Sequence, residues 1–557
     1  MSCNNNKCNR RGFATAIVLI FLAISSILLL SIYEIVGNYR NSAIKMRLQT
    51  QLDTDALNIL NVGVGFLKAK SAGLLGFTIT FSPNTPSWYN SDFLNKLNDQ
   101  WRSFVNQNVQ KNATFKIVSL TTSESYFADN LLRDEISSYK LERGLSSIEL
   151  YAFRINQLQV FLISRTEKNG ISVYSYGIVG SKLLNQYAYF TNKESISTSQ
   201  RIFFKAGELI DGPLRSHDYI NINPAGGKPT FLSTIEVLGI KDARGNIVQP
   251  QNYLDYANLQ GNPPYKILTS QDVSSLDFNV IKNEYKSSLS NVVKTYDEVK
   301  INPNILSGLK FTGPIQVSFN HGQSGSNYEV KISQGNVDYI ITWNPKPPDA
   351  KIRKQMLRGQ TEEFTFKFNG VIYSTDNLTV DGPTALSTYN GNYTLFSEKD
   401  VSIKDRIIPY QTYQNFFTAS EHGNNGNVVS QSGVQQIKNF VSTSETSSLN
   451  IVAMNNVTIA QKLENMKIFA SIFAFDGSFG LQGYDSGSPT GQLLVFGSIM
   501  QNIRGAVGTF NSMTGQTVTG YYKTYVYDPR IVTGAYQPYG TPTKSNTIRL
   551  FVLGVVK

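Results

Sequence analysis

The sequence predicts a mainly β protein with a long N-terminal helix. The expected order is a membrane-spanning helix, a small α+β head, and a parallel right-handed β-helix with a helical insertion. Three observations predict it. An apolar run without charge extends from Phe13 to Tyr33. Short alternating apolar triplets recur beyond residue 366 at spacings in the low twenties. Only 16% of the residues are charged, which is below the usual quarter and fits a polar, β-rich extracellular surface.

The apolar run is long enough to span a membrane. From Phe13 to Tyr33 it holds 21 residues, and about 20 helical residues cross the hydrocarbon layer. Three basic residues, Lys7, Arg10 and Arg11, precede it, which predicts a cytoplasmic amino terminus. We therefore expect a single-pass protein of the inner (cytoplasmic) membrane, with its bulk extracytoplasmic or at the cell surface. A secretory signal peptide fits less well, because its apolar core spans roughly 7–15 residues.

The residues around this run resemble a known family. A short basic leader ends at Gly12, Phe13 follows, and an apolar helix begins. This arrangement resembles the class III leader of type IV pilins, type II secretion pseudopilins and PilX-type minor pilins. The resemblance implies cleavage between Gly12 and Phe13 by prepilin peptidase, followed by N-methylation of Phe13. A glycine suits such a site because a protease can approach its backbone closely.

One position departs from the pattern of the family. Major pilins carry glutamate at the fifth mature position, where this chain has Ile17, and the first acidic residue is Glu34. The resemblance therefore favours a minor or tip subunit over a major one. The alternative is an uncleaved signal anchor.

The helix is expected to continue to about residue 70. Apolar residues recur at steps of three and four between polar ones, and they are Ile44, Leu48, Leu52, Ala56, Ile59, Leu60, Val64 and Leu67. A helix over 13–70 would measure roughly 85 Å at 1.5 Å per residue. The pilin resemblance implies that its second half packs on the head.

The head is predicted over 71–200, with a helix at 90–105 and strands that alternate apolar and polar residues. The β-helix-like domain is predicted over 201–530. From Leu378 to Val401 is 23 residues, and from Ile451 to Ile472 is 21. Ile472 to Val495 is also 23. Such a period, with several short strands in each, is typical of parallel β-helix coils. An antiparallel β-sandwich is the alternative.

Two helical segments interrupt the triplet pattern. One lies at about 274–299, inside a predicted insertion at about 224–365, and a smaller one lies near 430–440. The remaining segments are a leader peptide at 1–12 and C-terminal strands at 531–557. The sequences at 211–216, 368–373 and 493–530 resemble an uncharacterised family of large bacterial proteins that join a PilX-like amino terminus to a domain of unknown function. That resemblance implies no activity.

Composition limits the chemistry of the mature chain. Both cysteines, Cys3 and Cys8, precede the expected cleavage site, so neither a disulfide nor a thiol site is expected after it. The net charge is +11 and falls to about +8 without the three basic leader residues. The sequence shows no dense basic stripe and no nucleic-acid motif, so a nucleic-acid partner is not expected.

No enzyme signature is present. The three histidines are about a hundred residues apart, and nucleophile-elbow and Walker A motifs are missing. We expect neither an enzyme nor a cofactor or metal. One interpretation places five charged residues in a ligand groove near the end of the predicted coil stack. For the residues around Asp528, the alternative is a hydrogen-bonded pair with a structural role. The five are Asp476, Asp485, Arg504, Asp528 and Arg530.

The expected function is a structural one. The chain would be a minor or tip subunit of a type IV pilus or of a type II secretion pseudopilus-like filament, and its β-helix would contact surfaces or partners. The expected partners are the membrane, other pilin or pseudopilin subunits, prepilin peptidase and surface polysaccharide. The alternative is a membrane-anchored β-helix protein that binds or cleaves extracellular polysaccharide.

Overall fold

The computed structural model confirms the mainly β class, with 43% strand and 25% helix. It describes residues 5–70, 79–97, 101–102, 105–106, 109–110, 113–155, 159–180, 184–195, 201–274, 278–319, 329–343, 348–356, 359, 361–382, 384–418, 421, 423–533, 536, 538–542 and 549–556. Only the backbone is described at 5–30, 32–33, 37, 41, 184, 274, 532–533, 549–554 and 556.

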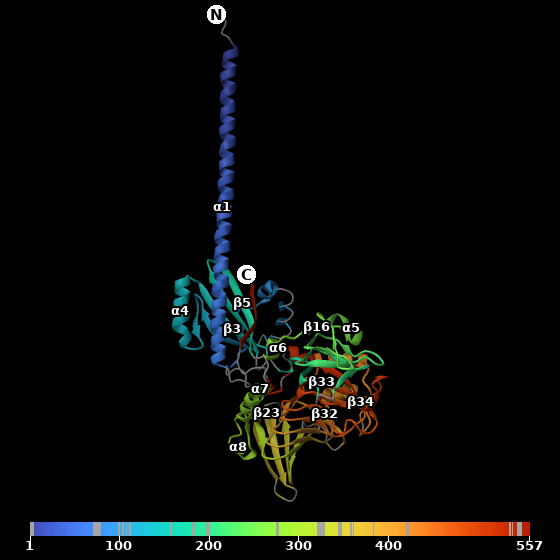
Figure 1. The fold of residues 1–557 in the computed structure, drawn as a ribbon. Coiled ribbons are helices and arrows are strands. Elements are labelled where there is room, and N and C mark those ends of the chain that lie inside the picture. The colour runs from blue at the N-terminus through green and yellow to red at the C-terminus, as the bar shows by residue number, and fades with distance from the viewer. Residues whose placement is uncertain are drawn as a thin grey trace.

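The chain begins with one continuous helix, α1 (Asn5–Ala69), which extends away from the rest of the molecule (Figure 1). Its 65 residues correspond to about 97 Å. Most of the predicted apolar run falls where side chains are not described. Across the side chains that are described, no helix is long and apolar enough to cross a membrane.

The second half of α1 packs on the head, as predicted. Leu52, Ala56 and Leu60 are fully buried against an antiparallel sheet. The Ser164 hydroxyl donates a hydrogen bond of 2.6 Å to the Ala56 carbonyl. At Gly63 an added Cβ would lie 3.0 Å from the side chains of Leu150 and Leu162, so the helix approaches the sheet closely there. The buried face begins at Leu48, whereas the prediction began at Ile44, which is 55% exposed.

The head sheet has six strands, and its last strand comes from the C-terminus. The order is β2-β1-β3-β4-β5-β36, with every neighbour antiparallel. The bounds are β1 (Thr114–Leu120), β2 (Ser125–Phe127), β3 (Ser147–Arg154), β4 (Gln159–Lys168), β5 (Ile171–Gly180) and β36 (Arg549–Val556). Helix α4 (Leu131–Arg143) adds Leu132 and Ile136 to the core beside α1.

The first part of the helix predicted at 90–105 is a short helix that ends before residue 97. Helix α2 (Ser91–Lys96) begins at the Asn90 cap, whose side chain accepts hydrogen bonds from Asp92 and Phe93. The backbone is extended at Leu97, which ends the helix there. Phe93 and Leu97 still pack on the aromatic face of the sheet, opposite α1.

The body is built from ladders of parallel strands. The main ladder contains, in spatial order, β17 (Val293–Lys294), β18 (Ser307–Phe311), β23 (Thr361–Ser374), β26 (Asn392–Ser397), β29 (Ser448–Ala453), β31 (Met466–Ala474), β33 (Pro489–Ile503), β35 (Thr517–Tyr527), β8 (Leu209–Asp211), β11 (Thr230–Phe231) and β15 (Asn258–Leu259). A second ladder contains β19 (Ile315–Phe319), β24 (Leu378–Val380), β27 (Val401–Ile403), β30 (Val457–Ile459) and β32 (Phe479–Leu481).

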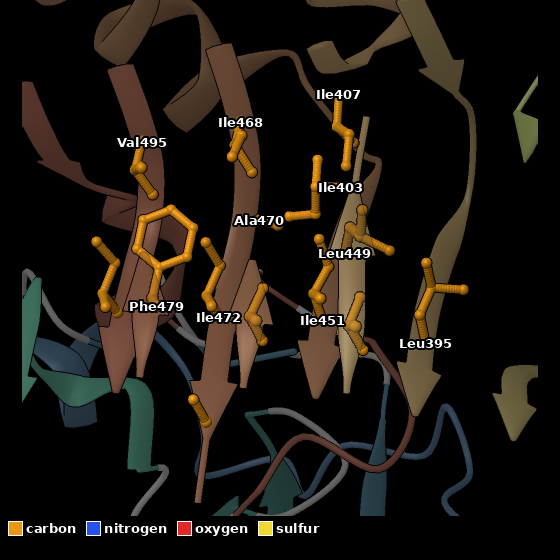
Figure 2. Close-up of a cluster of buried hydrophobic side chains, with 14 of the residues drawn as sticks. Leu395, Ile403, Ile407, Leu449, Ile451, Ile468, Ala470, Ile472, Phe479 and Val495 are labelled. Atoms are coloured by element: carbon orange, nitrogen blue, oxygen red, sulfur yellow. The ribbon is translucent and has the colours of Figure 1, made fainter. Parts of the chain in front are cut away.

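Equivalent side chains stack along the main ladder. Leu395, Ile451 and Ile472 occupy matching positions on adjacent strands and point into one apolar core (Figure 2). Two predicted spacings are confirmed, because Leu378 pairs with Val401 and Ile451 pairs with Ile472. The third is wrong. Ile472 pairs with Ile499 rather than Val495.

The sequence order and the spatial order of the strands differ. β6 (Tyr189–Lys193) pairs with β33 and β9 (Leu214–Ser216), so the ladders already begin inside the predicted head segment. β11 and β12 (Ile235–Val237) lie within the predicted insertion at 224–365, yet they continue the ladders in parallel. β11 has only two residues, which is too short for an alternating pattern.

Two further segments lie on the outside of the ladders. Helix α7 (Phe278–Ser290) buries Phe278, Ile281 and Tyr285 against aromatic residues from β6, β23, β26 and β31. Helices α9 (Tyr410–Phe416) and α10 (Gln431–Thr443) cover another face through Val434, Ile437 and Val441. The Ser430 side chain caps α10, in agreement with the predicted helix near 430–440.

Another part of the predicted insertion is an antiparallel extension of β19 and β23. β20 (Glu329–Gln334), β21 (Val337–Trp343) and β22 (Asp349–Met356) form it. A separate parallel set contains β7 (Phe203–Lys205), β10 (Tyr219–Asn223) and β13 (Gly239–Lys241), with β14 (Ile247–Val248) antiparallel at its edge.

Candidate functional site

The structure gives the five predicted groove residues three separate sets of partners. Arg530 and Asp528 form a buried ion pair of 2.7 Å. Arg530 also donates hydrogen bonds of 2.9 Å and 2.8 Å to the carbonyls of Glu445 and Ser447. The pair therefore ties helix α11 (Pro529–Thr533) to the loop before β29, which is the structural alternative that the sequence left open.

Arg504 has a different partner. Its guanidinium lies 2.7 Å from the Glu194 carboxylate, and both side chains are at most 1% exposed. It also donates a hydrogen bond of 3.2 Å to the Phe203 carbonyl and lies 3.8 Å from the centre of the Phe204 ring. Arg504 thus joins the end of β33 to β6 and β7.

The two remaining aspartates are exposed. Asp476 accepts hydrogen bonds of 2.9 Å and 2.8 Å from the Lys282 ammonium, which fastens α7 to the ladder. Asp485 lies in the exposed loop between β32 and β33. Within the described part of the chain, the Asp528–Arg530 pair is the only contact among these five residues.

A cavity of about 570 Å³ lies beside this junction and is lined by residues that the sequence analysis did not select. It is bounded by β7, by β34 (Gly508–Phe510) and by β35. Its charged lining consists of Arg201, Lys205, Glu208 and Lys523. We call it the Lys205–Lys523 cavity. No sequence signal marks it, because Glu208 and Lys523 are 315 residues apart.

Lys523 and Glu208 form the most buried charged pair of this cavity. The Lys523 ammonium lies 2.7 Å and 3.0 Å from the two Glu208 oxygens, and it donates a further hydrogen bond of 3.1 Å to the Phe203 carbonyl. Burial lowers the pKa of Lys523 to about 8, and nearby Arg504 and Lys205 act in the same direction against the attraction of Glu208. Burial also lowers the pKa of Lys205.

The buried Lys523 makes folding stability depend on pH. Its folded pKa of about 8 is below the ordinary 10.5, so the unfolded chain binds the proton more tightly. The free energy of unfolding should therefore be reduced most below pH 8 and rise between pH 8 and 10.5, by up to about 3 kcal/mol from this group. Urea unfolding at pH 7, 8, 9 and 10 measures this free energy of unfolding. Lys523→Met is the reference variant, because it lacks the titrating ammonium. The stability difference, wild type minus variant, should increase over pH 8–10, and a constant difference would contradict this prediction.

Other clusters offer less chemistry. Across the described residues, no three His, Cys, Asp or Glu side chains gather as they would around a metal ion. His217 accepts a hydrogen bond of 3.1 Å from Arg215 and packs edge-on against Phe190, within the core next to α7.

Comparisons with known proteins give one structural likeness to report. No protein-family model matches the chain, and no curated protein matches it. Among solved structures, the competence-associated pilin ComZ from Thermus thermophilus is similar over 91% of this chain and 96% of its own, with 9% sequence identity and a TM-score of 0.30.

Proposed function

We propose that this protein is a minor or tip subunit of a type IV pilus or of a type II secretion pseudopilus-like filament. Its N-terminal helix would lie in the inner membrane before assembly and pack among other pilin or pseudopilin subunits afterwards. The body would be displayed outside the cell for contact with a surface or a partner. In this proposal the parallel ladders form the β-helix that is displayed.

The part of α1 that extends beyond the head supports the proposal. The side chains described between Glu34 and Met46 are all exposed. They include apolar ones, and Val36, Ile44 and Met46 are 58%, 55% and 72% exposed. Exposed apolar side chains on a projecting helix are costly in water. They suit a helix whose partner is another molecule.

The β-helix part of the proposal is supported by the pairing. Parallel ladders with registers of 21 and 23 residues repeat from β23 to β31, apart from the helical excursion at α9 and α10. A closed stack of coils has few open strand edges, which suits a body displayed outside the cell.

Processing of the amino terminus tests the proposal. Mass spectrometry of the full chain, purified from cells that contain prepilin peptidase, should find N-methylated Phe13 as the first residue. A Gly12→Leu variant should keep its leader, because its side chain obstructs the approach of the protease to the backbone. Wild-type protein that still begins at Met1 would contradict the assignment to a pilin-like filament.

A further inference from the structure

We propose that the Lys205–Lys523 cavity binds a carboxylated sugar unit, such as a uronic acid residue of an acidic polysaccharide. The inference goes beyond the filament role and does not depend on it. The cavity volume of about 570 Å³ lies within the range of pockets that bind small molecules. The proposal rests on the surplus positive charge of the lining, on a buried ammonium with few partners, and on the aromatic side chains that line the same cavity.

The charges of the cavity do not balance. Glu208 uses both carboxylate oxygens on Lys523, so this pair is neutral. Lys205 and Arg201 remain, and both line the cavity. Within the described part of the chain, neither forms an ion pair at salt-bridge distance. The lining therefore has two positive charges that an anion could neutralise.

The Lys205 ammonium has few hydrogen-bond partners. Lys205 is only 5% exposed. In the described part of the chain its ammonium donates one hydrogen bond, which is long at 3.4 Å, to the Ala206 carbonyl. A buried ammonium has three donors and is costly when they lack acceptors. Oxygens of a bound carboxylate would supply the missing acceptors, and Arg201 offers a planar fork that fits the same group.

The aromatic part of the lining suits a sugar ring better than a small inorganic ion. Phe203 and Phe510 meet edge to face, with ring centres 6.0 Å apart, and both rings are half-buried at the cavity. Tyr484 is half-buried there too. Their apolar surface gains nothing from phosphate or sulfate, whereas the C–H face of a sugar can cover it. The Ser512 hydroxyl adds a polar group that can meet the hydroxyls of a sugar.

Calorimetric titration of the full chain with trigalacturonate tests this site. Wild type should bind, and uncharged galactotriose should bind at least about tenfold more weakly, because one charged hydrogen bond contributes roughly that much. Lys205→Met should weaken trigalacturonate binding at least about tenfold. Lys351→Met is the matched control: it removes the same charge from the antiparallel extension, outside the cavity, and should change binding less than twofold.

Arg201→Gln provides a second variant that does not alter the buried lysine, and it should also weaken binding at least about tenfold. Thermal unfolding midpoints establish that each variant is folded. The proposal is overturned if wild type does not bind trigalacturonate, if galactotriose binds equally well, or if a folded Arg201→Gln binds like wild type. It is also overturned if inorganic phosphate competes as strongly as trigalacturonate, because the cavity would then be a general anion site.

Discussion

Glu421→Gln is expected to lower the free energy of unfolding by about 3–5 kcal/mol, because it leaves two buried cations without their counter-charge. The Glu421 carboxylate lies 2.8 Å from Arg406 and 2.7 Å from Lys467, and all three side chains are at most 1% exposed. Burial lowers the pKa of both Arg406 and Lys467. Each charge is therefore already partly desolvated and depends on the carboxylate.

The same cluster holds a long loop against the ladders. The Arg406 guanidinium also donates hydrogen bonds of 2.7 Å and 2.9 Å to the carbonyls of Gly423 and Asn424. The Lys467 ammonium donates one of 2.8 Å to the Asn427 carbonyl. Loss of the carboxylate should therefore loosen the connection between α9 and α10 as well as destabilise the core beneath it.

Urea unfolding measures this loss, and Glu363→Gln is the matched control. Glu363 forms an ion pair with Lys351 on the exposed antiparallel extension, where such pairs contribute about 0–1 kcal/mol. Similar small losses for the two variants would show that Arg406 and Lys467 are satisfied without Glu421.

Gly497→Ala is expected to cost about 3 kcal/mol or more, from backbone strain and overpacking together. Gly497 lies in β33 between Ala470 of β31 and Tyr527 of β35. Its φ is +153°, and an added Cβ would lie 2.1 Å from the Ala470 carbonyl oxygen. The obstacle is backbone on a neighbouring strand, so the ladder itself must shift to admit a methyl group.

Gly335→Ala separates the two contributions. Gly335 has φ +57°, and its Cβ would meet nothing within 4 Å. The control therefore introduces strain in a left-handed conformation without a clash, and it should cost about 1 kcal/mol. Thermal unfolding of both variants compares them. Equal losses would mean that the close approach at Ala470 does not limit the stability of the ladder.

Periodicity predicted the regular part of the fold because adjacent strands of a ladder repeat the same inward positions. Leu378 with Val401, and Ile451 with Ile472, were found in this way. The full order of the strands could not be predicted, since the pairing of β35 with β8 joins Thr524 to Leu209, which no local pattern records. Residues in α1 were predicted well from Leu48 onward, where one face meets one sheet.

The sequence indicated only some of the partners of the predicted site residues, for a related reason. Asp528 and Arg530 are close in sequence, and their pairing follows from that. Arg504 and Glu194 are 310 residues apart, so the partner that neutralises Arg504 could not be recognised. Lys205 is a single lysine after three apolar residues, and only the fold shows that its side chain is buried beside a cavity.

The position of the C-terminal residues has a consequence for how a nascent chain reaches its native state. β36 adds the last strand to the head sheet, and β35 supplies the neighbour of β8. Both partners are synthesised more than 300 residues earlier, so each leaves an unpaired edge until nearly the whole polypeptide is available. Unpaired edges invite pairing with other chains. The first half of the polypeptide therefore needs protection from aggregation until translation is almost finished.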